Sequence, residues 1–141
     1  MTINQRKKGH DFERKISRML QDDLGLKKPV RRILSQYQEK DHPDLKIGRW
    51  NLECKAYKKG FEPAAAWWAQ VVGVTREHEF PALIYKFDNK PIRVRVRVSE
   101  VNPNLTDSLK VVDLNWESFC YLLKTIYEED LRAIFNELRD F

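Results

Sequence analysis

The stretch DHPDLKIGRWNLECKAYKK, residues 41–59, decides the fold because it predicts two strands joined by a tight turn. Gly48 and Arg49 suit a two-residue hairpin loop, since type II′ turns prefer glycine at their first position. In the register that this turn sets, Asp44 faces Glu53. Opposed residues have Cβ atoms about 4.5–5.5 Å apart, and two like charges there destabilise the hairpin. A divalent cation, a proton or a nearby lysine is needed to offset that repulsion.

Lys55 follows Glu53 by two residues, so strand alternation places it on the same face of the predicted hairpin. Oxygen ligands at close range suit a hard cation such as Mg²⁺, which needs only a few carboxylates. A metal makes a bound water easier to deprotonate and offsets charge on a phosphoryl oxygen. Lys55 can orient the attacking water or stabilise the phosphorane. The pattern therefore predicts phosphodiester hydrolysis, with Glu13 as a candidate further carboxylate.

The composition indicates one folded domain. The chain has 141 residues, 42% of them apolar, with four Trp and seven Phe. No run of about 18 apolar residues predicts a membrane span, and the polar start lacks the apolar core of a signal peptide. The two cysteines, Cys54 and Cys120, provide no disulfide framework. We therefore expect an intracellular protein of the cytoplasm, where cysteines stay reduced, with no membrane partner and no small-molecule cofactor.

The charge is distributed unevenly along the chain. Residues 1–98 carry 22 Lys and Arg against 12 Asp and Glu, whereas residues 99–141 carry 4 against 9. A basic body with an acidic end favours a polyanionic partner for the first part.

Hydrophobic periodicity predicts a mixed α/β fold in the order α-β-β-β-α-β-β, followed by a helical C-terminal region. The first helix is expected over residues 5–24, with Gly25 as its C-terminal cap. Proline at position 63 suits the first turn of a second helix. The expected elements are a helix at 5–24, a strand at 30–37, the hairpin within 41–59, a helix at 61–79, strands at 81–88 and 91–99, and a helix at about 115–139.

The segment PIRVRVRVS, residues 91–99, carries apolar residues on one face and three arginines on the other. The row of Arg93, Arg95 and Arg97 has two interpretations. It can contact phosphates, or it can form a solvated face that discourages edge-to-edge pairing.

These residues resemble a known family pattern. The pair Pro43-Asp44 with Glu53-Cys54-Lys55 resembles the PD-(D/E)xK motif of metal-dependent nucleases. The preceding helix KGHDFERKISRML is similar to the opening helix of archaeal-type Holliday-junction resolvases and their phage relatives, which carry a Lys-Gly pair and then a Glu-Arg pair. RRILSQ resembles their basic strand before the aspartate, and AWWAQ, ending at Gln70, resembles the helix after the lysine.

The resemblance implies a restriction-endonuclease-like core, with a central mixed sheet flanked by helices, over about residues 5–98 of a single domain. A helical extension would then cover about 99–141. It also implies a homodimer that cleaves four-way DNA junctions by paired nicks, in a bacterial, archaeal or phage-infected cell. The implied catalytic residues are Glu13, Asp44, Glu53, Lys55 and Gln70. The implied metal is Mg²⁺ or Mn²⁺, held by Asp44, Glu53 and Glu13, and the expected DNA contacts are Lys8, Arg14, Arg31, Arg32, Ser35, Gln36, Lys58 and Lys59.

Two alternatives stay open. A nuclease of the same fold acting on nicked, branched or ordinary duplex DNA has the same catalytic residues. A DNA-binding protein that keeps the fold without catalysis belongs to another class. The opposed carboxylates argue against this second alternative, because negative charge on a basic face weakens phosphate binding unless a metal is present.

Overall fold

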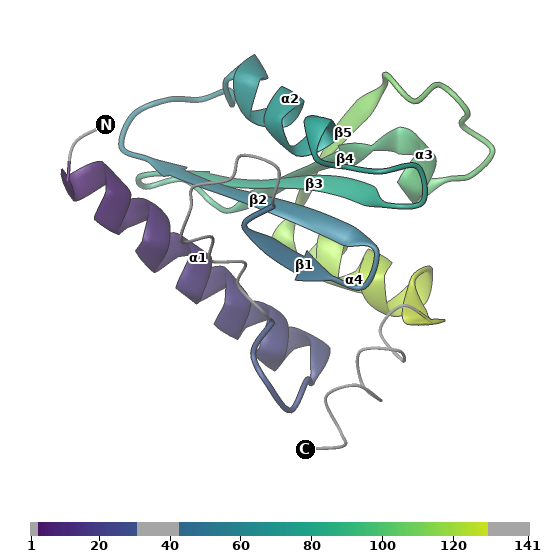
Figure 1. Cartoon of the computed structure of the whole chain (residues 1–141), viewed down its shortest axis with the longest axis horizontal. Helices are drawn as coiled ribbons and strands as arrows, with labels where there is room; N and C mark the ends of the chain where they lie inside the picture. The colour runs from purple at the N-terminus through teal and green to yellow at the C-terminus, as the bar shows by residue number, and fades with distance from the viewer. Residues whose placement is uncertain (1–2, 31–42, 130–141) are drawn as a thin grey trace.

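The computed structural model describes residues 3–30 and 43–129, and its centre is a five-stranded mixed sheet (Figure 1). The strand order across the sheet follows the order along the chain. Strands β2 and β3 pair in parallel, and the other neighbours are antiparallel. The strands are β1 (Leu45–Ile47), β2 (Trp50–Tyr57), β3 (Phe80–Phe87), β4 (Arg93–Arg97) and β5 (Val111–Asn115).

Helices cover both faces of the sheet, as Figure 1 shows. Helix α2 (Ala65–Gly73) connects the two parallel strands and packs on one face, and α1 (Ile3–Leu24) and α4 (Trp116–Thr125) pack on the other. A short helix, α3 (Val98–Val101), follows β4. This mixed, two-sided arrangement is consistent with the expected restriction-endonuclease-like core. In the part of the chain that the structure describes, no helix is both long and apolar enough to cross a bilayer.

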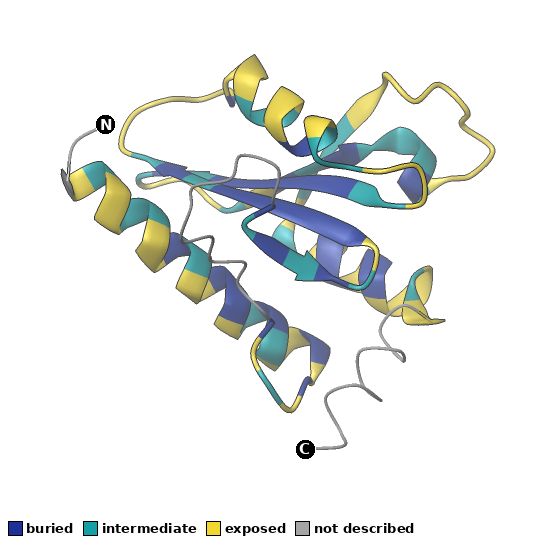
Figure 2. Cartoon of the chain, in the orientation of Figure 1, coloured by how far each residue is buried: buried dark blue, intermediate teal, exposed yellow. Residues whose placement is uncertain are grey.

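The main core lies between the sheet and the pair α1 and α4. Helix α1 contributes residues at three- and four-residue spacing, which form one apolar stripe. In Figure 2 this buried stripe of α1 faces the sheet, and its outer side is exposed. The members of this core from α1, β2 and α4 include Phe12, Ile16, Leu20, Leu52, Cys54, Phe119 and Leu123. A smaller core under α2 consists of Val71, Leu83, Tyr85 and Phe87, with Trp67 and Trp68 packed against it.

The predicted hairpin is confirmed. Leu45 pairs with Leu52, Lys46 with Asn51 and Ile47 with Trp50, which leaves Gly48 and Arg49 as the turn. Gly48 has a φ of 58°, a left-handed conformation that glycine adopts without the steric penalty of a side chain. The hairpin of β3 and β4 is also confirmed, with Leu83 opposite Arg95.

Two expectations need correction, and two others concern residues outside the described ranges. The second helix spans Ala65–Gly73 rather than 61–79, so Pro63 precedes it instead of lying in its first turn. Its early end at Gly73 agrees with the low helix propensity of glycine. Strand β5 lies inside the region expected to be helical from about residue 99, and it pairs with β4 over its whole length. The expected strand at 30–37 falls almost wholly outside the described residues, as does the C-terminal helix beyond residue 129.

Candidate metal centre

Strand β2 separates two kinds of side chain by its alternation. Leu52, Cys54 and Ala56 belong to the main core. Glu53 and Lys55 therefore point to the opposite face, the one that α2 covers. The same strand thus supports the core on one side and presents charged groups on the other.

Asp44 lies where the hairpin register predicts it. It directly precedes β1, and continuing the observed pairing by one residue places it opposite Glu53. Its Oδ2 accepts a hydrogen bond of 2.8 Å from the backbone N–H of Cys54. This bond attaches the Asp44 carboxyl to β2 beside the Glu53 side chain.

The two carboxyl groups are held in an unfavourable environment for negative charge. The Glu53 side chain is 2% exposed, and its Oε2 has no hydrogen-bond partner among the described residues. Burial raises the pKa of Glu53 well above its ordinary value, and the neighbouring Asp44 charge raises it further. Burial likewise raises the pKa of Asp44, against the opposing effects of the Cys54 N–H and Lys55. Lys55 Nζ lies 3.7 Å from Glu53 Oε1, so it offsets part of this cost.

The donor set fits a hard divalent cation. Two carboxyl groups from adjacent strands converge, and one buried oxygen lacks a partner. Between residues 3–30 and 43–129 no group of three or more His, Cys, Asp or Glu side chains is placed to hold a metal. A pair of carboxylates is nevertheless what Mg²⁺ commonly uses, because it keeps several of its waters. Asp44 and Glu53 can therefore hold Mg²⁺ or Mn²⁺.

Glu13 lies on α1, between the buried Phe12 and the core residue Ile16. It is half-buried, and its charge is among those that raise the pKa of Glu53 and of Cys54. Helix α1 thus turns this carboxylate toward β2. Its expected role as a metal ligand, directly or through water, stays a prediction.

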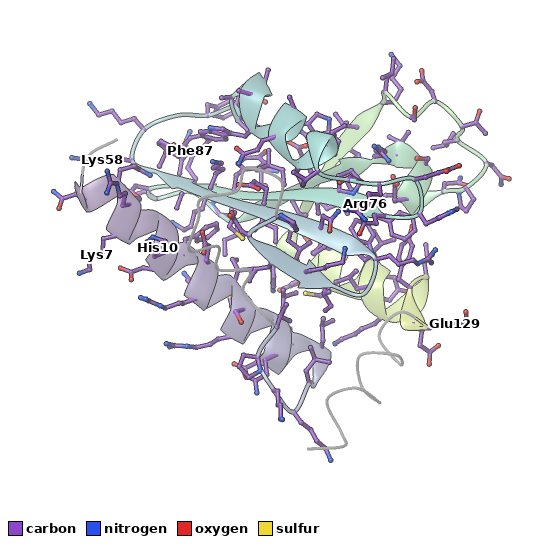
Figure 3. All side chains as sticks on the ribbon, viewed as in Figure 1. Lys7, His10, Lys58, Arg76, Phe87 and Glu129 are labelled. Carbon is purple, nitrogen blue, oxygen red and sulfur yellow. The ribbon has the colours of Figure 1, made fainter. Side chains whose placement is uncertain are left out.

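The other predicted site residues have varied surroundings. Gln70 is exposed on α2, and Lys58 and Lys59 are exposed just after β2. Figure 3 shows Lys58 at the end of the sheet where Phe87 ends β3. Lys8 and Arg14, two expected DNA contacts, form ion pairs with Asp88 and Asp11 respectively. The remaining expected DNA contacts, Arg31, Arg32, Ser35 and Gln36, lie outside the described residues.

The arginine row of β4 does not behave as one unit. Arg95 donates two hydrogen bonds, of 2.6 and 2.9 Å, to the Asp113 carboxylate of β5. Arg97 pairs with Glu100 at 3.7 Å. Of the three arginines, Arg93 is exposed and the other two are half-buried. The interpretation as a face that discourages edge-to-edge pairing is wrong, because β5 pairs with β4 and brings Asp113 to Arg95. Contact with phosphates stays a prediction.

Lys46, Asn51 and Glu79 form a hydrogen-bonded network next to Glu53, and the sequence predicted only that Lys46 faces Asn51. Asn51 is 1% exposed, and its side chain accepts from Lys46 at 2.9 Å and donates to Glu79 at 3.1 Å. Lys46 also donates to Glu79. Burial raises the pKa of Glu79, but hydrogen bonds from Lys46, the backbone N–H of Arg76 and Asn51 lower it to about 2. The network attaches the hairpin to the segment that enters β3.

The sequence matches a family model described as "Phage putative PDDEXK endonuclease" over residues 4–138. Comparisons with curated proteins and with solved structures return no significant match.

Proposed function

The chain belongs to this family of phage PDDEXK endonucleases, and on that premise we propose that it is a Mg²⁺-dependent endodeoxyribonuclease that resolves four-way DNA junctions. It would act as a homodimer, because two opposed nicks in a symmetric junction call for two related active sites. The family supports nuclease activity, and the junction, the metal and the dimer are our proposals.

One observation carries the catalytic proposal. The hairpin brings the carboxyl groups of Asp44 and Glu53 together under burial, with one Glu53 oxygen lacking a hydrogen-bond partner among the described residues. Such a pair is costly to the fold unless a cation or proton joins it. A protein that only binds DNA has no use for it, whereas a metal-dependent hydrolase does.

The chain's own residues have distinct roles in this proposal. Asp44 and Glu53 would hold the metal, with Glu13 contributing directly or through water. When bound, Mg²⁺ would offset the negative charge that builds up on the phosphoryl oxygens. Lys55, 3.7 Å from the Glu53 carboxyl, orients the attacking water or donates to a non-bridging oxygen of the phosphorane. Gln70 is proposed to complete the catalytic set, on the strength of the resemblance described above.

Basic side chains near the hairpin are proposed to hold the DNA backbone. Lys58 and Lys59 are exposed and follow Lys55 within the same segment. Arg31, Arg32, Ser35 and Gln36 are proposed to extend this surface from the segment before the hairpin. Each phosphate contact of this kind contributes affinity that falls with salt. Lys8 and Arg14 would have to exchange their carboxylate partners for phosphates.

The testing experiment compares cleavage of a synthetic four-way junction with cleavage of a linear duplex of the same arm sequence in MgCl₂. The Glu53→Gln protein is the control in both. Symmetric nicks in the junction alone, absent with the variant, support the proposal. Equal cutting of both substrates would replace junction resolution by general or nicking endonuclease activity. Binding without any cutting would indicate a non-catalytic DNA-binding protein.

A further inference from the structure

A pocket of about 260 Å³ lies on the α2 face of the sheet, away from the carboxylate pair. Aromatic and basic side chains line it from the segment before α2 and from β3, β4 and the turn between them. The lining residues that matter here are Phe61, Tyr85, Lys90, Arg93 and Asp113. Its volume is below the roughly 300–1,000 Å³ of sites for drug-sized ligands, so it suits a single ring system. We call it the Phe61 pocket.

The polar wall of the Phe61 pocket is fixed by hydrogen bonds. The Tyr85 hydroxyl donates to Asp113 Oδ2 at 2.6 Å. Arg95 donates to both oxygens of the same carboxylate, at 2.6 and 2.9 Å. The Asp113 charge is therefore paired with Arg95, although Glu62, a second carboxylate that lines the pocket, lies 3.6 Å from the same guanidinium.

The rim presents one large aromatic ring and two cations. Phe61 is 73% exposed, which is a high exposure for a phenylalanine. Lys90 Nζ lies 4.4 Å from the centroid of this ring, a cation–π contact. Arg93 is exposed beside them. An exposed aromatic ring with adjacent cations is the arrangement that binds a base by stacking and its phosphate by charge.

The backbone on both sides of Phe61 is held in place. Gly60 has a φ of 152°, and a Cβ there would lie 2.3 Å from Cε1 of Phe87, so the chain passes directly over that ring. On the other side, Glu62 pairs with Arg95 at 3.6 Å. The close approach of Gly60 to Phe87 thus places Phe61 beside the sheet, and the exposed Glu62 adds a contact with Arg95.

The Phe61 pocket lies on the same face of the sheet as Lys55. Lys55 pairs with Tyr85, and Tyr85 pairs with Arg93, in one row across three strands. Adjacent strands are about 4.8 Å apart, so the backbones of Lys55 and Arg93 are separated by about 10 Å. At a rise of about 3.4 Å per nucleotide along one strand, this corresponds to about three nucleotides from the hydrolytic site.

We propose that the Phe61 pocket binds one unpaired nucleotide of the DNA substrate, with its base stacked on the face of Phe61 opposite Lys90 and its phosphate beside Lys90 and Arg93. This inference rests on the proposed function, because it gives that nuclease a means of recognising DNA in which a base has left the stack. A fully paired duplex offers no such base without unpairing first.

The experiment measures binding of a duplex with a single-nucleotide bulge and of the fully paired duplex, in EDTA so that Mg²⁺-dependent cutting is absent. Phe61→Ala is expected to weaken binding of the bulged duplex by roughly 10-fold or more, as removal of a stacking platform does, and to leave the paired duplex unchanged. Phe61→Trp is expected to restore the preference. Tyr121→Ala is the matched control, because Tyr121 is 70% exposed and lies on α4, on the other face of the sheet.

A 2-aminopurine base at the bulge gives a second readout, since stacking on Phe61 quenches its fluorescence. Quenching that survives Tyr121→Ala and is lost with Phe61→Ala supports the inference. If the wild type cuts the junction but Phe61→Ala and Tyr121→Ala bind and quench alike, the pocket assignment is wrong and the proposed function stands. If the wild type binds neither duplex and cuts no junction, both are wrong.

Discussion

Replacing Glu53 with glutamine is expected to stabilise the metal-free protein. At a Cβ separation of about 5 Å and an effective dielectric constant of about 20, repulsion between Asp44 and an ionised Glu53 is about 3 kcal/mol. The attraction of Lys55 Nζ, 3.7 Å from Glu53 Oε1, is about 4.5 kcal/mol on the same scale. The attraction exceeds the repulsion by only about 1 kcal/mol, so the desolvation of a side chain that is 2% exposed is the larger contribution.

Desolvation of a buried carboxylate costs several kcal/mol even after relaxation. The carboxyl avoids this cost by taking up a proton, as its raised pKa of about 9 indicates. Holding a proton at pH 7 against an ordinary pKa of 4.5 itself costs about 3 kcal/mol, and glutamine is neutral without that cost. We therefore expect Glu53→Gln to raise the free energy of unfolding in EDTA by about 1–3 kcal/mol. Mg²⁺ at a hundredfold excess over its Kd should stabilise the wild type by about 2.7 kcal/mol and leave the variant unchanged.

The assay is urea unfolding at pH 7, followed by circular dichroism, in EDTA and in MgCl₂. Glu117→Gln is the control, because it removes an exposed carboxylate from α4 and should respond to Mg²⁺ like the wild type. An equal Mg²⁺ response of wild type and Glu53→Gln would refute the metal assignment. A variant less stable than the wild type in EDTA would refute the argument from desolvation.

Three further predictions concern catalysis, pH and the backbone. Lys55→Ala should lower kcat by about 10²–10³ yet keep the Mg²⁺-dependent gain in unfolding free energy; unchanged turnover would remove Lys55 from the mechanism. Glu79→Gln should cost about 1–2 kcal/mol at pH 7 after allowance for screening. The folded pKa of Glu79 is about 2 against an ordinary 4.5. The difference in unfolding free energy between wild type and variant should therefore persist above pH 4.5 and vanish as the pH falls toward 2, measured by urea titration. A difference that is independent of pH would contradict the ion-pair argument. Gly60→Ala should cost about 1–3 kcal/mol through its φ and its contact with Phe87, and a midpoint equal to that of wild type would show that this segment adjusts freely.

The hairpin and its opposed carboxylates were predictable because the information is local. A glycine at the turn and a strict alternation of apolar residues fix which residues face each other. The register of Leu45 and Leu52 and the position of Asp44 follow from those two features alone. The position of the carboxyl pair was therefore predictable from fewer than twenty residues.

Strand β5 and the network around Glu79 were not predictable in this way. The centre of β5 is Asp113, a poor strand residue whose charge is offset by Arg95 from β4. Glu79 meets Lys46 only after α2 has returned the chain to the sheet. In both cases the stabilising partner is distant in sequence, and no local pattern identifies it.

Because β2 presents core residues on one face and charged residues on the other, we expect substitutions within it to be tolerated better than insertions or deletions. A point substitution such as Glu53→Gln alters one face and leaves Leu52 and Cys54 in the core. An inserted or deleted residue within β2 would exchange the faces beyond it, exposing core side chains and burying charged ones. Replacements can therefore alter Glu53 or Lys55 and leave the core intact, whereas we expect length changes to be tolerated in connections such as residues 102–110, between α3 and β5.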